Sequence, residues 1–298
     1  MKTYLDCIPC FFKQALEASR IAGANEKIQR RVLDAVAEAL PEFPLEASPP
    51  QMGRIIYNLV REYTETDDPY LQIKEQSNRL ALSIYDRAIN DLSRGQDRLL
   101  NAVELAIAGN IIDYGVNNTL DIGVELESIL STERNKIGDE DRTFFNIDSF
   151  KKSLSEANTV LYLGDNAGET VFDRILMEEI KRMDGTKTIT YAVKEKPSIN
   201  DALKKDAVDC GIDTIAEIIS SGSDAPGTIP ALCSDEFMNR FHKADIVISK
   251  GQGNFEGLSD SERTVFFLLI AKCPVIAADI GCRVGNMVLL HHVPCQLK

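Results

Sequence analysis

The second half of the chain alternates short apolar strands with amphipathic helices, and this alternation limits the folds open to it. The predicted strands are residues 160–163, 188–193, 217–219, 246–249 and 275–278. The helices predicted between them are residues 171–183, 202–210, 234–243 and 261–271. Strands that alternate with helices form sheets covered by helices on both faces. The sequence therefore predicts a three-layer α/β domain with a mainly parallel sheet over residues 157–298.

The first 130 residues carry a helical pattern instead. Apolar side chains recur at intervals of three and four over residues 11–22, 27–40, 51–64, 70–91 and 98–114. Glycine and proline separate these segments. Residues 131–156 are highly charged and show little periodicity, apart from a short helix expected near residues 149–157. We therefore expect a helical N-terminal domain (1–130), a linker (131–156) and the α/β domain (157–298).

The overall charge excludes one class of partner. The 298 residues carry a formal net charge of -13, whereas nonspecific binding of nucleic acid requires a basic surface. No run of 18 apolar residues is present, and the first residues, M-K-T-Y-L-D-C, lack the apolar core of a signal peptide. We expect a cytoplasmic protein that binds neither nucleic acid nor membrane.

Polar residues follow the first predicted strand directly. The stretch T-V-L-Y-L-G-D-N-A-G-E-T, residues 159–170, is typical of a strand, a turn and the start of a helix. Asp165 and Asn166 would then lie at the carboxyl end of the strand, where α/β proteins bind ligands. Their oxygens, with those of Glu169, suit a hard cation such as Mg²⁺ or Mn²⁺. Equally, Asp165 and Asn166 could merely turn the chain and cap the helix.

Polar residues also follow two later strands. Asn200 and Asp201 begin a helix after the second strand, and Lys250, Asn254 and Glu256 lie in the glycine-rich loop K-G-Q-G-N-F-E-G. In a parallel sheet these loops meet at one edge. Taken singly, each residue could be a helix-terminal charge, a surface lysine or part of a turn. A metal ion with an oxyanion ligand would account for them together.

A polar pair stands out in the helical region. Asn110 and Asp113 lie three residues apart on one helical face of A-G-N-I-I-D-Y-G, among apolar side chains. Buried polar groups need partners. Either the pair contributes to a site, or it is exposed and ends the helix before Gly115.

Cysteine and histidine give weaker signals. Seven scattered cysteines do not indicate a disulfide framework. Cys7 and Cys10 form a C-x-x-C pair, which could be packed thiols, half of a metal site or a local disulfide. The chain has three histidines, none on a predicted strand-end loop. The neighbouring His291-His292 pair could chelate a metal ion, but we expect it to be solvated.

In combination and order, these motifs resemble a known family. The sequences G-D-N-A-G-E, P-S-I-N-D, K-G-Q-G-N-F-E-G and the upstream G-N-x-x-D look like those of the metal-dependent damage-control phosphatases, formerly called domain of unknown function 89. The C-I-P-C start is similar to the prokaryotic subgroup. The resemblance covers the chain from Cys7 to about Asp279. It implies a helical domain packed on a Rossmann-like α/β domain, with Mg²⁺, Mn²⁺, Co²⁺ or Ni²⁺ between them.

The resemblance also implies residue roles. The family's metal ligands match Asp165, Asn166 and Asp201, and its conserved lysine matches Lys250. Catalytic roles are then expected for Lys250, Glu169 and Asp113. Substrate contacts are expected for Asn110, Gly168, Asn254 and Asn200.

The expected reaction is hydrolysis of phosphate monoesters of small metabolites, such as sugar phosphates or damaged phosphometabolites. Lys250 and the N–H groups after Gly168 would neutralise the developing charge, while Asp113 or Glu169 orients a water for in-line attack on a metal-bound phosphoryl group. A covalent aspartyl-phosphate remains open. Because Asp165 lacks the x-Asp-x-Thr/Val context of haloacid-dehalogenase phosphatases, direct hydrolysis is preferred.

Two other functions remain open. The stretch L-Y-L-G-D-N-A-G-E faintly resembles the glycine-rich loop of S-adenosylmethionine-dependent methyltransferases, and a relative has been described as a carboxyl methyltransferase. The stretch nevertheless lacks G-x-G-x-x-G. A non-catalytic metal-binding protein would hold its ion with no open coordination position. The sequence determines neither the substrate, the physiological metal nor the oligomeric state.

Overall fold

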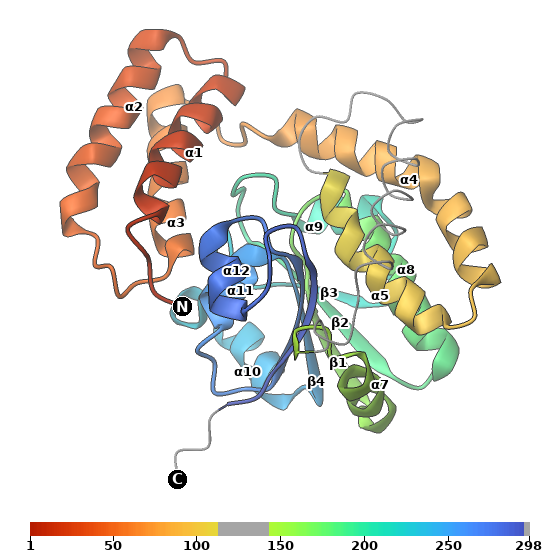
Figure 1. Ribbon diagram of the computed structural model, residues 1–298. Coiled ribbons are helices and arrows are strands. Elements are labelled where there is room, and N and C mark those ends of the chain that lie inside the picture. The colour runs from red at the N-terminus through yellow and green to blue at the C-terminus, as the bar shows by residue number, and fades with distance from the viewer. Residues whose placement is uncertain (113–142, 295–298) are drawn as a thin grey trace.

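A six-stranded sheet forms the centre of the protein (Figure 1). The computed structural model describes residues 1–112 and 143–294. The strands are β1 (Thr159–Leu163), β2 (Thr188–Val193), β3 (Glu217–Ser220), β4 (Ile246–Lys250), β5 (Val265–Ile270) and β6 (Met287–His292). Their order is β3-β2-β1-β4-β5-β6, in which β1 to β5 are parallel and β6 is antiparallel to β5. This is a doubly wound, Rossmann-like order, and it confirms the predicted fold class.

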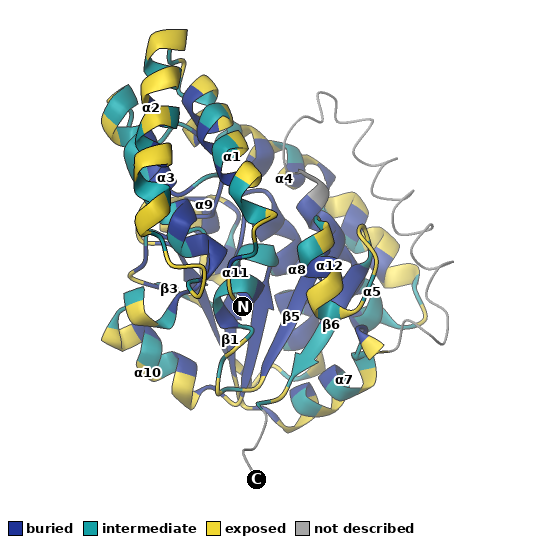
Figure 2. Ribbon diagram, turned by 60° about the vertical axis from the view of Figure 1, so that its left-hand side comes forward, coloured by how far each residue is buried: buried dark blue, intermediate teal, exposed yellow. Residues whose placement is uncertain are grey.

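The central strands are apolar on both faces because helices cover both. Every residue of β4 is buried, and so are four of the five residues of β1. Figure 2 shows the sheet as the most buried part of the molecule. Parallel strands covered on both sides lack the alternation of a half-exposed strand and show continuous apolar runs instead. The covering helices include α8 (Glu169–Met183), α9 (Lys204–Asp209), α10 (Asp235–Lys243), α11 (Gln252–Leu258) and α12 (Pro274–Ile280).

Three N-terminal helices form a bundle with its own core. They are α1 (Cys7–Ile21), α2 (Glu26–Ala39) and α3 (Pro49–Thr64). Phe11, Val36 and Ile56 belong to one apolar cluster shared by these helices. The side chain of Asn25 caps α2 by accepting from the Ile28 N–H, and α3 begins with proline, as helix starts favour. The bundle stands beside one end of the sheet (Figure 1).

The next two helices belong to the other core. Helices α4 (Leu71–Arg94) and α5 (Arg98–Ala108) pack against α8, and their apolar residues join the cluster formed by β1, β2 and β4. The helices expected to form one N-terminal domain thus divide between two cores. Residues 131–142 of the predicted linker lie outside the described residues, but its last part forms α7 (Ile147–Glu156), which buries Phe150 and Leu154 in the sheet's core.

The last third of the chain differs from the predicted elements. The segment predicted as helix 261–271 contains β5, and the segment predicted as strand 275–278 lies in α12. Strand β6 was not predicted, and α11 occupies the expected glycine-rich loop. Short apolar runs fit a buried strand and a buried helix equally well, which explains the exchange.

The histidine pair was expected to be solvated, and this expectation is wrong. His291 and His292 lie in β6 and are half-buried. The His291 ring stacks on Phe266 with 4.3 Å between centroids, and His292 Nε2 lies 2.8 Å from Ser261 O. Separately, none of the helices within residues 1–112 and 143–294 has the length and apolarity needed to cross a membrane.

Candidate active site

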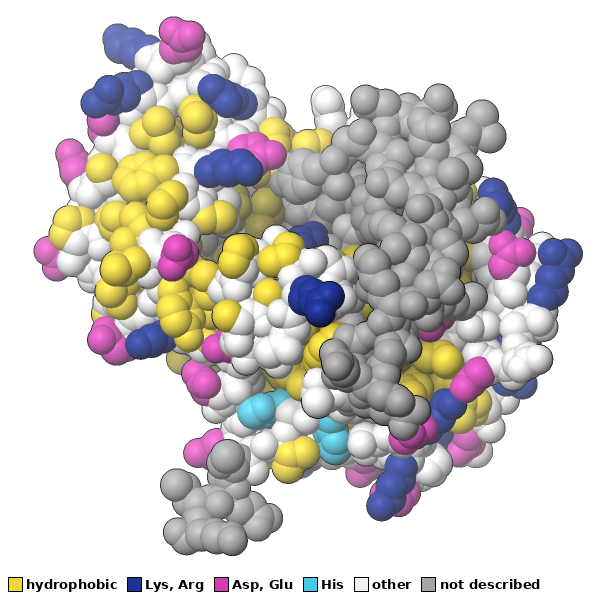
Figure 3. All heavy atoms as spheres, in the orientation of Figure 1, with side chains coloured by type: hydrophobic (Ala, Val, Ile, Leu, Met, Phe, Trp, Pro, Cys, Tyr) yellow, Lys and Arg dark blue, Asp and Glu magenta, His cyan; other side chains and the backbone are white. Residues whose placement is uncertain are grey.

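A cavity of about 1040 Å³ lies where the bundle faces the carboxyl ends of the strands. Its α/β wall includes the loops after β1 and β2 and the first residues of α11. Its bundle wall comes from α1 and α3, over which hydrophobic side chains gather on the face shown in Figure 3. Because the chain order reverses between β1 and β4, the cavity occupies the place where open α/β sheets bind ligands. The bundle wall includes Cys7, Cys10, Phe11, Gln14, Pro50 and Tyr57.

The loops after β1 and β2 are tied to each other by backbone hydrogen bonds. The Ala167 N–H donates to Asn200 O over 2.9 Å, and the Ala202 N–H donates to Asp165 O over 2.8 Å. Asn166 and Asp201 face each other in this antiparallel bridge. Residues predicted from two separate motifs therefore line one wall of the cavity together: Asp165, Asn166, Asn200 and Asp201.

The second loop has an unusual backbone conformation. Ile199 has a φ of 43°, in the left-handed region that β-branched residues rarely adopt. The Asp201 N–H donates to Ser198 O over 3.0 Å and closes the turn around Ile199. Strain of this kind persists where surrounding contacts enforce it, often at functional sites. Here it lies directly before Asn200 and Asp201.

The amide of Asn166 is oriented by two carboxylates. Its Nδ2 donates to Asp165 Oδ2 over 3.1 Å and to Glu169 Oε1 over 2.8 Å. Asn110 Nδ2 also donates to Glu169 Oε1. Because the NH₂ group of Asn166 faces these carboxylates, its carbonyl oxygen points away from them. Glu169 thus fixes which end of the Asn166 amide can act as an acceptor.

A buried ion cluster lies behind Asn166. Lys250 Nζ lies 3.0 Å from Glu169 Oε2 and 2.7 Å from Asp173 Oδ1, and all three side chains are at most 1% exposed. Burial acts to lower the pKa of Lys250, but the two carboxylates outweigh burial and raise it. Burial raises the pKa of Asp173 despite the charge of Lys250. Lys250 therefore contacts the carboxylates behind the cavity wall.

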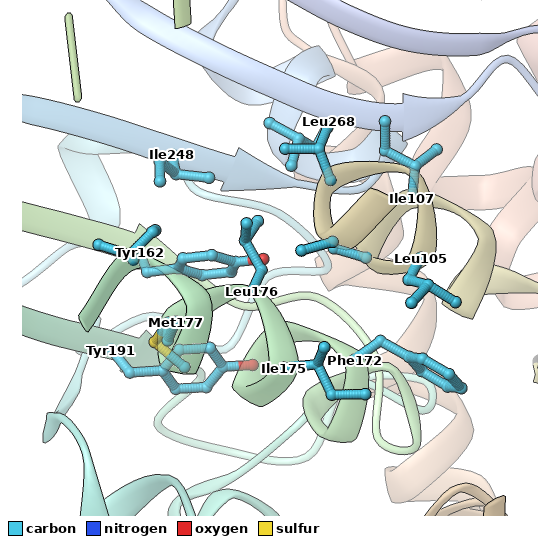
Figure 4. Close-up of a cluster of buried hydrophobic side chains, with 14 of the residues drawn as sticks. Leu105, Ile107, Tyr162, Phe172, Ile175, Leu176, Met177, Tyr191, Ile248 and Leu268 are labelled. Atoms are coloured by element: carbon cyan, nitrogen blue, oxygen red, sulfur yellow. The ribbon is translucent and has the colours of Figure 1, made fainter. Parts of the chain in front are cut away.

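Two tyrosines complete this cluster. Tyr162 donates to Asp173 Oδ1 over 2.7 Å and Tyr191 donates to Asp173 Oδ2 over 2.9 Å. Their rings stack with 5.5 Å between centroids, and Figure 4 shows the two hydroxyl ends turned the same way. Burial raises the pKa of both phenols, which therefore remain donors. Asp173 was not predicted as a site residue, because an aspartate within an amphipathic helix is usually exposed.

Two glycines bring backbone close to the site. Gly251 has a φ of 80°, and a Cβ there would lie 1.9 Å from Asp165 Oδ2. Gly168 has a φ of 82°, and its N–H donates to Asn78 Oδ1 over 2.7 Å. Asn78 was not predicted as part of the site. The N–H of Gly168, a predicted substrate contact, is thus bound by a side chain of α4.

Asn254 connects several strand ends. It is fully buried, and its Nδ2 donates to Gly164 O over 3.1 Å and to Lys250 O over 2.7 Å. Its Oδ1 accepts from Lys194 Nζ over 3.1 Å and from Thr228 Oγ1 over 2.8 Å. Asn254 therefore lies beneath the cavity wall, where its contacts are made by the protein itself.

Of the polar pair Asn110 and Asp113, only Asn110 lies within the described residues. Asn110 lies in the short helix η2 (Gly109–Ile112), is 5% exposed and reaches Glu169. Asp113 lies outside the described residues. The residue roles expected from the sequence remain predictions.

The cysteine pair lines the same cavity. Cys7 and Cys10 are both free thiols, and burial raises the pKa of Cys7. In the described part of the chain, no three His, Cys, Asp or Glu side chains are grouped so as to hold a metal ion. The candidate ligand set is instead two aspartates and the Asn166 amide, all hard oxygen donors.

Comparison with known proteins places these residues in context. Residues 3–288 match the model of the damage-control phosphatase ARMT1-like domain. An uncharacterized protein of Methanocaldococcus jannaschii is 37% identical, with 96% of this chain and 94% of that protein covered. A damage-control phosphatase of Pyrococcus horikoshii is 33% identical, with 98% of this chain and 99% of that protein covered. A crystal structure of a DUF89 family protein from P. horikoshii has a TM-score of 0.88 at 31% identity, covering 98% of this chain and 99% of that one.

Proposed function

Because the chain belongs to the damage-control phosphatase ARMT1-like family, we propose that it hydrolyses phosphate monoesters of small metabolites with the help of a divalent metal ion. The observation that carries this proposal is the pairing of the loops after β1 and β2. That pairing brings Asp165, Asn166 and Asp201 to one wall of a large cavity.

The residues present fit a hard divalent cation. Asp165 and Asp201 supply carboxylate oxygens, and the orientation of the Asn166 amide supplies a carbonyl oxygen on the side away from Glu169. Gly251 has no side chain, and the Asp165 carboxylate lies in the space that a Cβ there would need. Mg²⁺, Mn²⁺, Co²⁺ or Ni²⁺ would be held by these three residues. The bound ion would act as a Lewis acid toward a phosphoryl oxygen and lower the pKa of a bound water.

The residues behind the wall hold the ligands in place. Glu169 orients the Asn166 amide, and Lys250 neutralises part of the charge of Glu169 and Asp173. Partners of this kind orient metal ligands and affect metal affinity. We assign Lys250 a positioning role through Glu169, because its ammonium group binds carboxylates and is 1% exposed.

The opposite wall suits the organic part of the substrate. Tyr57 and Phe11 offer apolar surface, whereas Gln14 offers an amide, and all three face the cavity from the bundle. A cavity of about 1040 Å³ is large enough for a small phosphorylated metabolite. Sugar phosphates and damaged phosphometabolites are the proposed substrates, and the bundle would shield the reacting phosphate from bulk water.

The test is phosphate release by protein stripped with a chelator. p-Nitrophenyl phosphate and a panel of sugar phosphates would be supplied with each of the four metal ions, beside an Asp165→Ala variant. Turnover that requires metal and is lost in the variant supports the proposal. Binding of S-adenosylmethionine without phosphate release would favour a methyltransferase, and tight metal binding without any turnover would favour a non-catalytic metal-binding protein.

A further inference from the structure

A carboxyl group outside the candidate metal site faces the same cavity. Glu256 lies in α11, one turn after Gln252, and both side chains line the cavity together with Asp165 and Asp201. Glu256 is partly buried. The sequence places Glu256 in the glycine-rich loop but gives it no specific role.

The Glu256 side chain is held in one orientation. Gln252 Oε1 accepts from the backbone N–H of Lys272 over 3.2 Å, so the other end of the amide, Nε2, faces Glu256 Oε1 at 2.9 Å. Within residues 1–112 and 143–294, Oε2 of Glu256 has no hydrogen-bond partner. One oxygen is therefore fixed by the protein while the other is available to a ligand in the cavity.

We infer that Glu256 is the general acid that protonates the leaving-group oxygen of the substrate. This assignment rests on the proposed phosphatase function. The metal ligands lie on the wall formed by the loops after β1 and β2, and Glu256 lies on the adjoining α11 wall. A phosphate held at the first wall, with its ester oxygen toward the second, would turn that oxygen to the side of the cavity that Glu256 lines.

The acidity of Glu256 suits this role. Burial raises its pKa to about 7, against the opposing effects of the Gln252 hydrogen bond and the Met1 ammonium group. A general acid works best when its pKa is close to the working pH. The other titratable side chains that line the cavity near it, from the N-terminal segment, α1 and the α12 region, are Tyr4, Asp6, Cys7, Lys272, Cys273 and Asp279.

In the hydrolysis step, water replaces the ester oxygen on phosphorus. The oxygen of the attacking water bonds to phosphorus, and the bond from phosphorus to the ester oxygen breaks. The leaving oxygen takes the proton of Glu256, so the products are an alcohol and hydrogen phosphate. One proton of the water remains on the phosphate, and the other restores Glu256 through solvent.

The leaving group provides the test. An alkyl phosphate needs its leaving oxygen protonated, whereas p-nitrophenolate leaves without a proton. Glu256→Gln keeps the shape of the side chain and the oxygen that accepts from Gln252, but it removes the acidic proton of the carboxyl group. We expect kcat/KM for an alkyl phosphate to fall by roughly 10²–10⁴-fold in this variant, with little change for p-nitrophenyl phosphate.

Glu17→Gln is the matched control, because Glu17 is a carboxylate of the same cavity on α1. In this variant, kcat/KM for the two substrates should change by equal factors. An equal loss of both substrates in Glu256→Gln would overturn the assignment while leaving the phosphatase function standing. Failure of the wild-type protein to hydrolyse either substrate would instead overturn the proposed function.

The wild-type protein gives a second test without substitution. The rate for the alkyl ester relative to the aryl ester should fall as pH rises through about 7, because Glu256 loses its proton there. A ratio that does not change with pH would contradict the assignment.

Discussion

Gly251 lies so close to Asp165 that a Cβ on the glycine would be 1.9 Å from the carboxylate oxygen Oδ2. Gly251→Ala must therefore displace the carboxylate, and we expect metal-dependent phosphate release to fall by more than about 100-fold. The measurement is kcat/KM against metal concentration, together with metal affinity by calorimetry.

Gly23→Ala is the control for backbone strain. Gly23 has a φ of 74°, close to the 80° of Gly251, but a Cβ there would meet no atom within 4 Å. Both variants should lose stability because of the positive φ, and Gly251→Ala should lose more than the roughly 1–2 kcal/mol typical of a left-handed residue, because its ψ of 162° lies in a region that is essentially limited to glycine. If Gly23→Ala lost as much activity as Gly251→Ala, general strain rather than the position of Asp165 would explain the result.

Glu169→Gln should weaken metal binding by about 10–100-fold, because it removes the negative charge that orients the Asn166 amide and binds Lys250. Calorimetric titration with Mn²⁺ measures this directly. Glu178→Gln serves as the control, since Glu178 lies on the same helix but accepts from Tyr85 near the surface. Equal Mn²⁺ affinities in the two variants would show that Glu169 does not contribute to metal binding.

Tyr162→Phe and Tyr191→Phe should each destabilise the fold by about 1.5–3 kcal/mol, because each removes a donor to the buried Asp173 carboxyl. Tyr85→Phe, whose hydroxyl binds the partly exposed Glu178, should cost less. Urea denaturation of the three variants gives the comparison. Equal losses of unfolding free energy in the three variants would show that burial of the Asp173 carboxyl does not determine the size of the loss.

The contact between Arg54 of the bundle and Asp224 of the α/β domain should make stability depend on pH. Burial raises the pKa of Asp224, but the hydrogen bond and charge of Arg54 outweigh burial and lower it below the ordinary 3.8. A lowered carboxyl pKa stabilises the fold above pH 3.8, and this contribution disappears as pH falls through the lowered value.

Asp224→Asn should therefore lower Tm at neutral pH, and its difference from wild type should shrink as pH falls below 3.8. Thermal melts from pH 7 downward measure the difference. A Tm difference that is constant with pH would show that the Asp224 charge does not contribute.

The sequence predicts the first four strands because each is a short apolar run bounded by turns and followed by a helical pattern. It fails at β5, whose run V-F-F-L-L-I is apolar throughout and has no period. It fails again at α12, whose residues V-I-A-A resemble a strand although Pro274 in the first turn favours a helix start. The distinction is made by pairing with β4 and β6, which no local pattern contains.

Some residues of the candidate site could also be predicted from the sequence, and others could not. Asp165, Asn166 and Asp201 could be predicted because they follow strands, and parallel strands bring their carboxyl ends together. Asp173 could not, since its partners Tyr162 and Tyr191 lie on two strands whose inward faces are known only from the fold. Glu256 could be predicted near the cavity in the same way, but its place one turn after Gln252 could not, because it depends on a helix where the sequence indicated a loop.

Metal binding and turnover can be measured together by titrating chelator-treated protein with Mn²⁺ and then following phosphate release on the same sample. Asp201→Asn is the variant, and Asp209→Asn, which alters an aspartate of α9 bound to Lys205, is the control. We expect wild type and Asp209→Asn to bind Mn²⁺ and to gain turnover in proportion to metal occupancy, whereas Asp201→Asn should lose both. Equal turnover with and without metal, or Mn²⁺ binding unchanged in Asp201→Asn, would contradict this expectation.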